Sequence, residues 1–200
     1  MQQAILTIQE SNHQSIGISM VSGAATAQVP AVDAELVRAF LRSEVDLIGQ
    51  ENNTIVWDPA CGEGAIGRVL EEAGITVFGS DRGNTTFGIP AVDFLASDVR
   101  LADMAISCPP SNQVAEYVRH ALHHLQLGYI AFLVETEFWQ TSSGVALSRD
   151  LPPTFAYLST LGTEIRGRHI AAGGAMWCVW LGLWRGATEL RFLTQPGARS

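Results

Sequence analysis

Three short groups of residues in this sequence have types and spacings that suit chemistry. The first is the run Asp58-Pro59-Ala60-Cys61-Gly62-Glu63-Gly64, which leads into a helical pattern. Glycines let the backbone turn sharply and approach a ligand that a Cβ atom would repel. The helix behind them offers unpaired N–H groups. The run therefore predicts a ligand-binding loop, with a plain glycine-rich turn as the alternative.

The second group is Asp81 with the neighbouring Arg82. Asp81 follows the apolar stretch Ile75–Gly79 and lies 23 residues after Asp58. In nucleotide-binding folds an acidic residue about 20 residues beyond the glycine loop meets the ribose hydroxyls. A carboxylate can accept hydrogen bonds from both hydroxyls. A turn aspartate is the alternative for Asp81 taken alone, but its pairing with the glycine loop favours the ribose role.

The third group is Cys108-Pro109-Pro110-Ser111, directly after the apolar stretch Met104–Ser107. Two prolines cannot continue a strand ladder, and they hold a stiff backbone with exposed carbonyls. Ligands of open α/β sheets bind at the carboxyl ends of the strands. We therefore expect this group to face the same ligand as the glycine loop, with a simple strand terminator as the alternative.

The elements that would position these groups alternate along the chain. Apolar strand patterns occur at 54–57, 75–79, 104–107 and 129–134, and helical patterns at 33–42, 64–73 and 113–125. The stretches 154–159 and 176–184 read as strands joined by an extended loop. This order predicts an α/β, doubly wound fold with a mostly parallel sheet, helices on both faces and a C-terminal antiparallel hairpin. Residues 1–28 are expected to form a loosely ordered leader, and residues 29–200 one domain.

Composition narrows the class of protein. The chain has 200 residues, of which 47% are hydrophobic and 16% charged, and its net charge is −8 with no lysine. Bulk charge therefore does not hold it on nucleic acid. No apolar run is long enough to span a bilayer, and no secretory signal is visible. Three scattered cysteines suit a reduced, cytoplasmic compartment and argue against a disulfide framework or a zinc site.

With these groups in this order, the chain resembles Rossmann-type, or class I, S-adenosylmethionine-dependent methyltransferases. More narrowly, it resembles the small phage-type amino-methyltransferases related to DNA adenine-N6 methylases. The resemblance runs from about Pro30 to Trp184. It implies that S-adenosylmethionine is the cofactor and that it is bound by residues of the first motif, the ribose acid, the Asp93-Phe94 motif and a weaker match at the N-terminus: Asp58, Ala60, Gly62, Gly64, Asp81, Arg82, Asp93, Phe94 and Pro30.

The catalytic motif departs from that family. The family pattern there is Asp, Asn or Ser, then Pro-Pro, then an aromatic residue that stacks on the flipped base. Here Cys108 and Ser111 occupy the first and last positions. A thiol is a weak acceptor, and serine has no ring to stack. The Pro109 carbonyl remains to accept one hydrogen bond, and Trp139 is the candidate for the missing stacking surface.

A local basic patch favours a nucleic-acid partner. From residue 151 onward the sequence contains five arginines and only two glutamates. Arg166, Arg168 and His169 lie in the expected C-terminal loop. Such side chains contact phosphates or stack on bases, although a solvated loop explains them equally well. His120 and His124 share a helical face, but no third ligand is evident, so no metal site is predicted.

Three functions stay open. The first is a methyltransferase that acts on an amino nitrogen, with adenine N6 of DNA as the leading acceptor. The second is an accessory or regulatory protein that binds S-adenosylmethionine without turnover, which Cys108 and Ser111 favour. The third is an NAD(P)-dependent oxidoreductase, suggested by the glycine fingerprint and Asp81. The sequence does not determine the methyl acceptor, whether a recognition partner exists, or whether the protein forms a homodimer.

Overall fold

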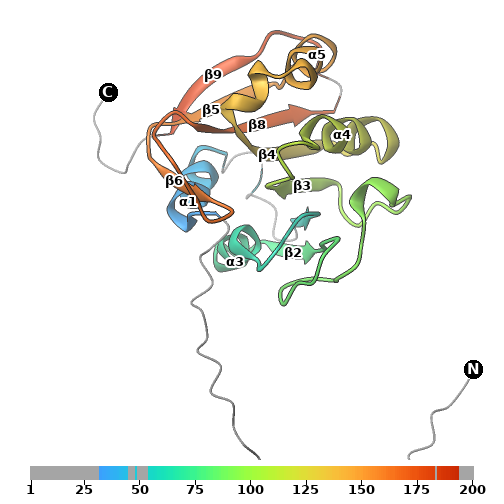
Figure 1. Cartoon of the computed structure of the whole chain (residues 1–200). Helices are drawn as coiled ribbons and strands as arrows, with labels where there is room; N and C mark the ends of the chain where they lie inside the picture. The colour runs from blue at the N-terminus through green and yellow to red at the C-terminus, as the bar shows by residue number, and fades with distance from the viewer. Residues whose placement is uncertain (1–31, 45–47, 49–53, 183, 194–200) are drawn as a thin grey trace, which may run out of the picture.

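The computed structural model describes residues 32–44, 48, 54–182 and 184–193. Figure 1 shows the elements along the chain. In order they are α1 (Ala34–Ser43), β1 (Ile55–Asp58), α3 (Ala65–Glu72), β2 (Thr76–Gly79), η1 (Phe94–Ala96), β3 (Met104–Ser107), α4 (Val114–Arg119), η2 (His120–His124), β4 (Tyr129–Glu135), η3 (Thr136–Gln140), α5 (Ser142–Asp150), β5 (Phe155–Ser159), β6 (Thr163–Ile165), β7 (Arg168–Ile170), β8 (Ala175–Leu181) and β9 (Glu189–Leu193). The expected leader and Pro30 lie outside the described residues.

One seven-stranded sheet organises these elements, in the order β2-β1-β3-β4-β8-β5-β9. The strands β2, β1, β3 and β4 are parallel to one another. Strand β8 is antiparallel to both β4 and β5, and β9 runs parallel to β5. This arrangement confirms the predicted mostly parallel α/β sheet and its antiparallel strand pair near the C-terminus.

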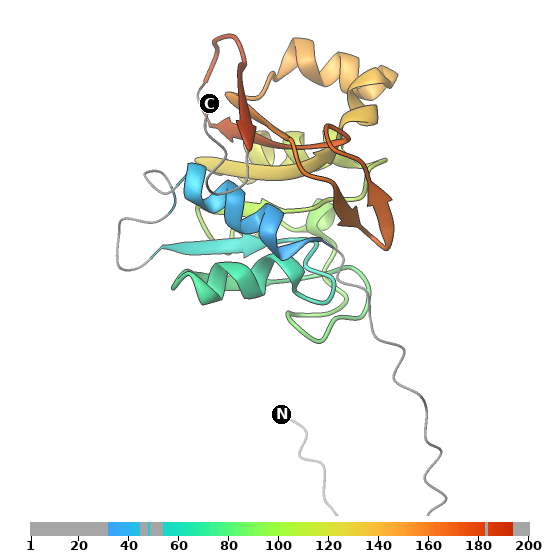
Figure 2. The same ribbon diagram turned by 90° about the vertical axis from the view of Figure 1, so that its left-hand side faces the viewer.

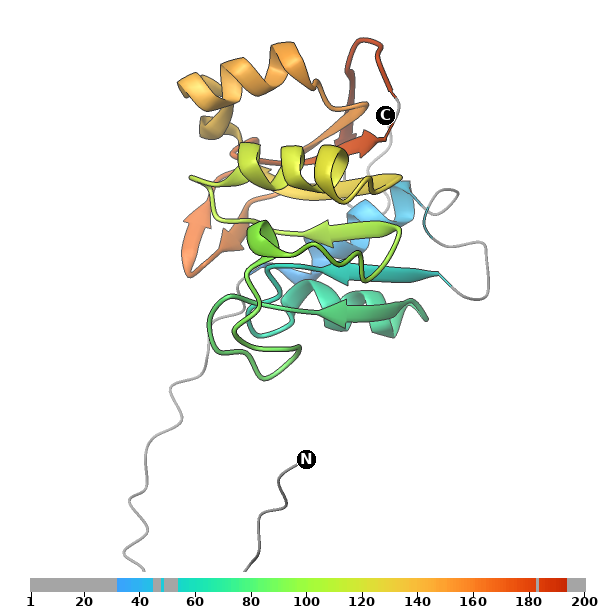
Figure 3. The same cartoon turned by 90° about the vertical axis from the view of Figure 1, so that its right-hand side faces the viewer.

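Helices cover both faces of the sheet, as the sequence predicted. Leu36 and Phe40 of α1 and Leu70 of α3 pack with the strand residues of one face. Val118 of α4 and Leu147 of α5 pack with those of the other face. Figure 2 shows α1 in front of the sheet, and Figure 3, from the opposite side, shows α4 there. Apolar burial on two faces is what the near-continuous hydrophobic strands require.

The start of α1 shows how the sequence fixes a helix end. The Asp33 carboxylate accepts a hydrogen bond from the Glu35 backbone N–H at 2.8 Å and so caps the first turn. Such a cap satisfies a donor that the helix itself leaves unpaired. The helical pattern predicted over residues 33–42 is confirmed.

The C-terminal third is more elaborate than the predicted hairpin. Strand β8 lies inside the sheet, because it pairs with β4 over seven residues as well as with β5. Strand β9 lies beyond β5 and forms the sheet edge. The segment expected to be an extended loop contains β6 and β7, which pair as a separate two-stranded sheet. Helix α5 was not predicted either.

Candidate active site

The carboxyl ends of the central strands bring the glycine loop and the double-proline loop together. Strand β1 ends at Asp58 and its neighbour β3 ends at Ser107. The Ser107 hydroxyl donates to Asp58 Oδ1 at 2.6 Å and accepts from the Ala60 backbone N–H at 3.2 Å. Asp58 and Ser107 are both buried. One buried hydroxyl therefore joins the two loops that the sequence singled out.

The second oxygen of Asp58 is the unusual feature of this site. Asp58 Oδ2 is buried and has no hydrogen-bond partner within the described part of the chain. Burial raises the pKa of Asp58 to about 7, although hydrogen bonds from Ser107 and the Ala60 backbone oppose this shift. A buried carboxylate oxygen without a partner is costly. A cationic or hydrogen-donating ligand would supply what this oxygen lacks.

Asp81 accepts hydrogen bonds from the glycine loop and keeps further acceptor capacity. Its Oδ2 accepts from the Gly62 backbone N–H at 3.0 Å, and its Oδ1 accepts from the Gly83 N–H at 2.7 Å. Gly62 has φ of 50°, a conformation that favours glycine, and open space surrounds the position of a Cβ atom there. Each carboxylate oxygen can accept a further hydrogen bond. Asp81 thus supports the loop and can still bind hydroxyl groups.

Gly64 packs beside Phe87 and is not among the residues that line the cavity described below. A Cβ atom on Gly64 or Gly67 would collide with the ring of Phe87, and one on Gly79 would lie 2.8 Å from that ring. The loop between β2 and η1 therefore packs onto α3 through Phe87. This packing and the φ of 83° at Gly64 both favour glycine at this position.

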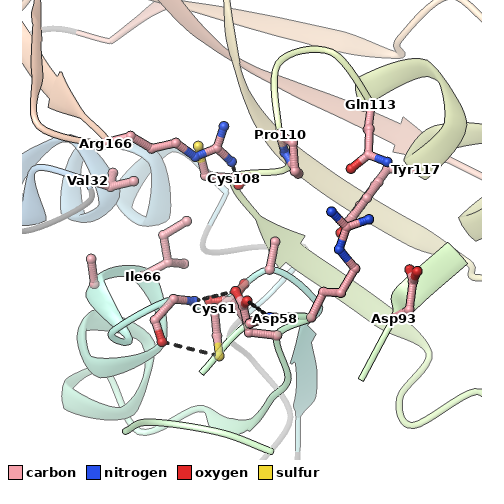
Figure 4. Close-up of a pocket in the computed structure, with 16 residues that line it drawn as sticks. Val32, Asp58, Cys61, Ile66, Asp93, Cys108, Pro110, Gln113, Tyr117 and Arg166 are labelled. Atoms are coloured by element: carbon pink, nitrogen blue, oxygen red, sulfur yellow. Dashed lines mark hydrogen bonds between the residues drawn. The ribbon is translucent and has the colours of Figure 1, made fainter. Parts of the chain in front are cut away.

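A cavity of about 490 Å³ lies between these loops (Figure 4). Nine predicted site residues line it: Asp58, Ala60, Gly62, Asp81, Arg82, Asp93, Cys108, Pro110 and Arg166. Seven further residues that the sequence analysis did not single out also line it: Val32, Cys61, Ala65, Ile66, Gly83, Gln113 and Tyr117. The glycine loop, Asp81 and the proline loop therefore share one cleft.

The positions of Gln113 and Tyr117 at the cavity could have been predicted from the sequence. Gln113 and Tyr117 are four residues apart at the start of the predicted helix, so they lie on one face of it. That helix follows the proline loop directly, and the Gln113 N–H donates to the Pro110 carbonyl at 2.8 Å. Burial raises the pKa of Tyr117 to about 12, so its phenol stays protonated.

The group Cys108-Pro109-Pro110-Ser111 is held by neighbours on several elements. Burial raises the pKa of the Cys108 thiol to about 11, so it is neutral at physiological pH. The Cys108 carbonyl accepts from Arg166 Nη2 at 2.8 Å. Pro109 is buried and does not line the cavity. Ser111 is exposed and donates to Glu135 at 3.1 Å, so its side chain does not face the cleft.

Four further predicted residues, besides Gly64, Pro109 and Ser111, do not line the cavity. Phe94 is fully buried, and its ring packs against Trp57, Tyr117 and His120. Trp139 lines a separate cavity of about 290 Å³ and packs against Phe138, so it does not replace the missing stacking ring. Arg168 forms an ion pair with Glu135, and His169 is exposed on β7.

Potential metal ligands do not cluster within the described residues. There, no group of three His, Cys, Asp or Glu side chains is placed to hold a metal ion. His120 and His124 stack on each other, and His124 contacts Asp98 at 2.7 Å. No helix in the described part of the chain is long and apolar enough to cross a membrane.

Solved structures with the same architecture include two restriction-modification proteins. A type I restriction-modification system methyltransferase subunit from Streptococcus thermophilus aligns with a TM-score of 0.55 and 10% identity, covering 78% of this chain and 46% of its own. A protein assigned as a modification subunit of a type I restriction enzyme from Vibrio vulnificus gives 0.54 and 12%, covering 81% and 47%.

A third similar structure is a protein assigned as a class I S-adenosylmethionine-dependent methyltransferase from Listeria monocytogenes. Its TM-score is 0.51 at 15% identity, and the alignment covers 78% of this chain and 62% of that one. The chain thus spans about half to three-fifths of these proteins. No protein-family model matches it, and no curated protein matches it in sequence. The chain has the fold of class I S-adenosylmethionine-dependent methyltransferases.

Proposed function

We propose that this protein is an S-adenosylmethionine-dependent methyltransferase that acts on an amino nitrogen, with adenine N6 of DNA as the leading acceptor. The observation that carries the proposal is the unpartnered, buried Asp58 Oδ2 in a cleft that also contains Asp81 and Asp93. Fold likeness alone does not assign a function. The chemistry of the cleft therefore has to support it.

The residues present fit the proposed cofactor. Asp58 would hold its ammonium group, Asp81 its ribose hydroxyls and Asp93 its adenine amino group, because each of these ligand groups donates hydrogen bonds and carboxylates accept them. Asp93 is free to do so through one oxygen, since its Oδ1 already accepts from the Leu95 N–H at 3.0 Å. When bound, S-adenosylmethionine supplies a methyl carbon on a positively charged sulfur.

The chain's part in the transfer is to place and orient the acceptor nitrogen. In-line displacement depends on alignment of the attacking atom, which is worth several kcal/mol. The cleft wall formed by Pro110 is stiff, and the Gln113 amide lies beside it. An amide oxygen accepts from an NH₂ group better than a thiol does, so Gln113 supports an amino acceptor despite Cys108. The nitrogen releases its proton to water after transfer.

A second candidate has its own supporting observations. Cys108 is a neutral thiol, its carbonyl is taken by Arg166, and Ser111 turns away from the cleft. These features favour a protein that binds S-adenosylmethionine as an accessory or regulatory chain without turnover. Both candidates share the binding step and differ only in transfer.

Binding is tested first, by titration calorimetry with S-adenosylmethionine, its demethylated product S-adenosylhomocysteine, and NADH. We expect micromolar binding of the first two. Asp58→Asn should weaken both on the order of 10- to 100-fold, the range for a hydrogen bond to a charged group. Asp98→Asn, an exposed change outside the cleft, is the matched control. Binding of NADH but of neither adenosyl compound would refute both candidates.

Transfer is tested by incubating the protein with tritiated methyl donor and unmethylated DNA, RNA or protein. Tritium incorporation into DNA that is lost in Cys108→Ala or Pro109→Ala supports the methyltransferase function. Cys108→Asn, which installs a stronger acceptor, should raise the transfer rate. Intact binding with no transfer to any pool, by the wild type or by Cys108→Asn, supports the second candidate.

A further inference from the structure

Arg166 occupies a backbone position that disfavours it. It joins β6 to β7 in a two-residue turn with Gly167, and their φ angles are 50° and 73°. Turns with two positive φ values prefer Asn-Gly or Gly-Gly. For other residues the left-handed conformation is unfavourable, because the Cβ atom lies too close to the backbone. A strained residue that persists in a cleft points to a role for its side chain.

Contacts on both sides of the turn fix where this side chain points. Ile165 is buried and bridges to Val32, at the start of the described chain. Arg168 is held by Glu135 at the end of β4. The Arg166 guanidinium then reaches the cleft and donates to the Cys108 carbonyl. Figure 4 shows it beside Cys108, on the side of the cleft that Val32 and Ile66 line.

Arg166 is not neutralised by the protein. Within the described residues no carboxylate lies at ion-pair distance from it. Its hydrogen bond to the Cys108 carbonyl uses one of the five N–H donors of a guanidinium. Asp58 and Arg166 are linked through two adjacent residues. Ser107 donates a hydrogen bond to Asp58, and the carbonyl of the next residue, Cys108, accepts one from Arg166. The cleft therefore presents an unsatisfied carboxylate oxygen and an unpaired guanidinium near one loop.

We propose that Arg166 binds the carboxylate of the amino-acid part of S-adenosylmethionine, while Asp58 takes the ammonium group on the same carbon. The inference rests on the proposed function. A zwitterionic α-amino acid carries these two charges side by side, and a guanidinium fork matches a carboxylate in geometry and charge. The β6–β7 hairpin is then a wall of the cofactor site. The sequence-based role of Arg166 in contacting nucleic acid is the competing assignment.

The test compares two ligands that differ in this group. S-adenosylhomocysteine carries the carboxylate, whereas 5′-deoxy-5′-methylthioadenosine lacks the whole amino-acid part. By calorimetry, Arg166→Gln should weaken S-adenosylhomocysteine on the order of 10- to 100-fold and change methylthioadenosine less than twofold. Arg38→Gln, which removes the same charge from an exposed residue of α1, should change neither.

A second pair of variants separates binding from folding. Arg166→Gly and Arg166→Ala both remove the guanidinium, but only glycine relieves the strained φ. We expect equal losses of S-adenosylhomocysteine affinity, with the glycine variant unfolding at the higher temperature. The inference is overturned if Arg166→Gln leaves that affinity unchanged, weakens both ligands equally, or weakens only DNA binding. If the wild type binds no adenosyl compound, the proposed function itself fails.

Discussion

We expect Asp58 to make ligand binding and folding respond to pH in opposite directions. Burial raises its pKa from 3.8 to about 7. Between about pH 4 and 7 the folded state therefore keeps a proton that the unfolded state has already released. Over this window the group lowers the free energy of unfolding as pH rises, by up to about 1.4 kcal/mol per pH unit. A ligand ammonium group needs the ionised form, so affinity should rise over the same window.

The measurement compares the wild type with Asp58→Asn, because other groups titrate too. Denaturant unfolding at pH 5 and pH 7.5 should show that the wild type loses more stability than the variant between these two pH values. The wild-type affinity for S-adenosylhomocysteine should be greater at pH 8 than at pH 6. Ser107→Ala removes a hydrogen bond that lowers the pKa of Asp58, so it should move the affinity midpoint to higher pH. A pH-independent affinity would contradict the role of Asp58.

Site residues differ in how far sequence reasoning could place them. Asp58, Asp81 and Asp93 were predicted because each follows a recognisable strand or motif, and all three line the cleft. Phe94 was assigned to the ligand, but it follows Asp93 directly and packs into the core instead. Side-chain direction one residue from a motif depends on tertiary packing, which the pattern does not encode.

At the scale of elements, Phe87 fastens the loop after β2 to helix α3. Its ring fills the space over Gly64 and Gly67, and the Arg68 guanidinium lies 5.3 Å from the ring centroid. The same loop carries Asp81 and Gly83 at the cleft. One aromatic side chain therefore connects helix α3 to the loop that carries Asp81.

The effect of Gly67→Ala on stability should therefore have opposite signs in the wild type and in a Phe87→Ala background. In the wild type, Gly67→Ala should destabilise by about 1–3 kcal/mol, because its methyl group meets the Phe87 ring. In a Phe87→Ala background the space is open, and alanine is favoured over glycine in a helix by about 1 kcal/mol. The same change should then stabilise. Chemical unfolding of the four proteins measures this, and equal effects in both backgrounds would show that the ring does not rest on Gly67.

Elements with strong local patterns were predictable, and weaker ones were not. The strands β1, β3 and β4 are apolar and almost wholly buried, and helix α1 is capped by Asp33. Helix α5 buries only Gly144 and Leu147, so its apolar spacing is too sparse to predict a helix. Strand β9 alternates Leu190 and Phe192 with charged residues. That alternation is a strand signal, which the sequence analysis did not use.

At the scale of the whole molecule, a buried polar network ties the N-terminal helix to the C-terminal strands. The Glu44 carboxylate, just after α1, accepts from the phenols of Tyr129 and Tyr157. Arg191 of β9 lies 3.7 Å from it and also donates to Tyr157. Burial and the Glu44 charge raise the pKa of both phenols, which keeps them protonated as donors. Pairings across more than 80 residues of sequence cannot be predicted from local patterns, and neither could the insertion of β8 between β4 and β5.

This network and the cleft lie at opposite ends of the strands, so stability and binding should separate. Tyr129 begins β4, whereas Glu135, at the other end of the strand, faces the proline loop. Tyr129→Phe removes one hydrogen bond to a buried carboxylate, which contributes about 1.5–3 kcal/mol. For a protein of this size that loss lowers the melting temperature by about 3–12 °C. The dissociation constant for S-adenosylhomocysteine, measured well below the transition, should stay within twofold. In a Glu44→Gln background the same change should have a smaller effect, since the buried charge is gone. A lower affinity in the folded Tyr129→Phe variant would show instead that the sheet transmits this network to the cleft.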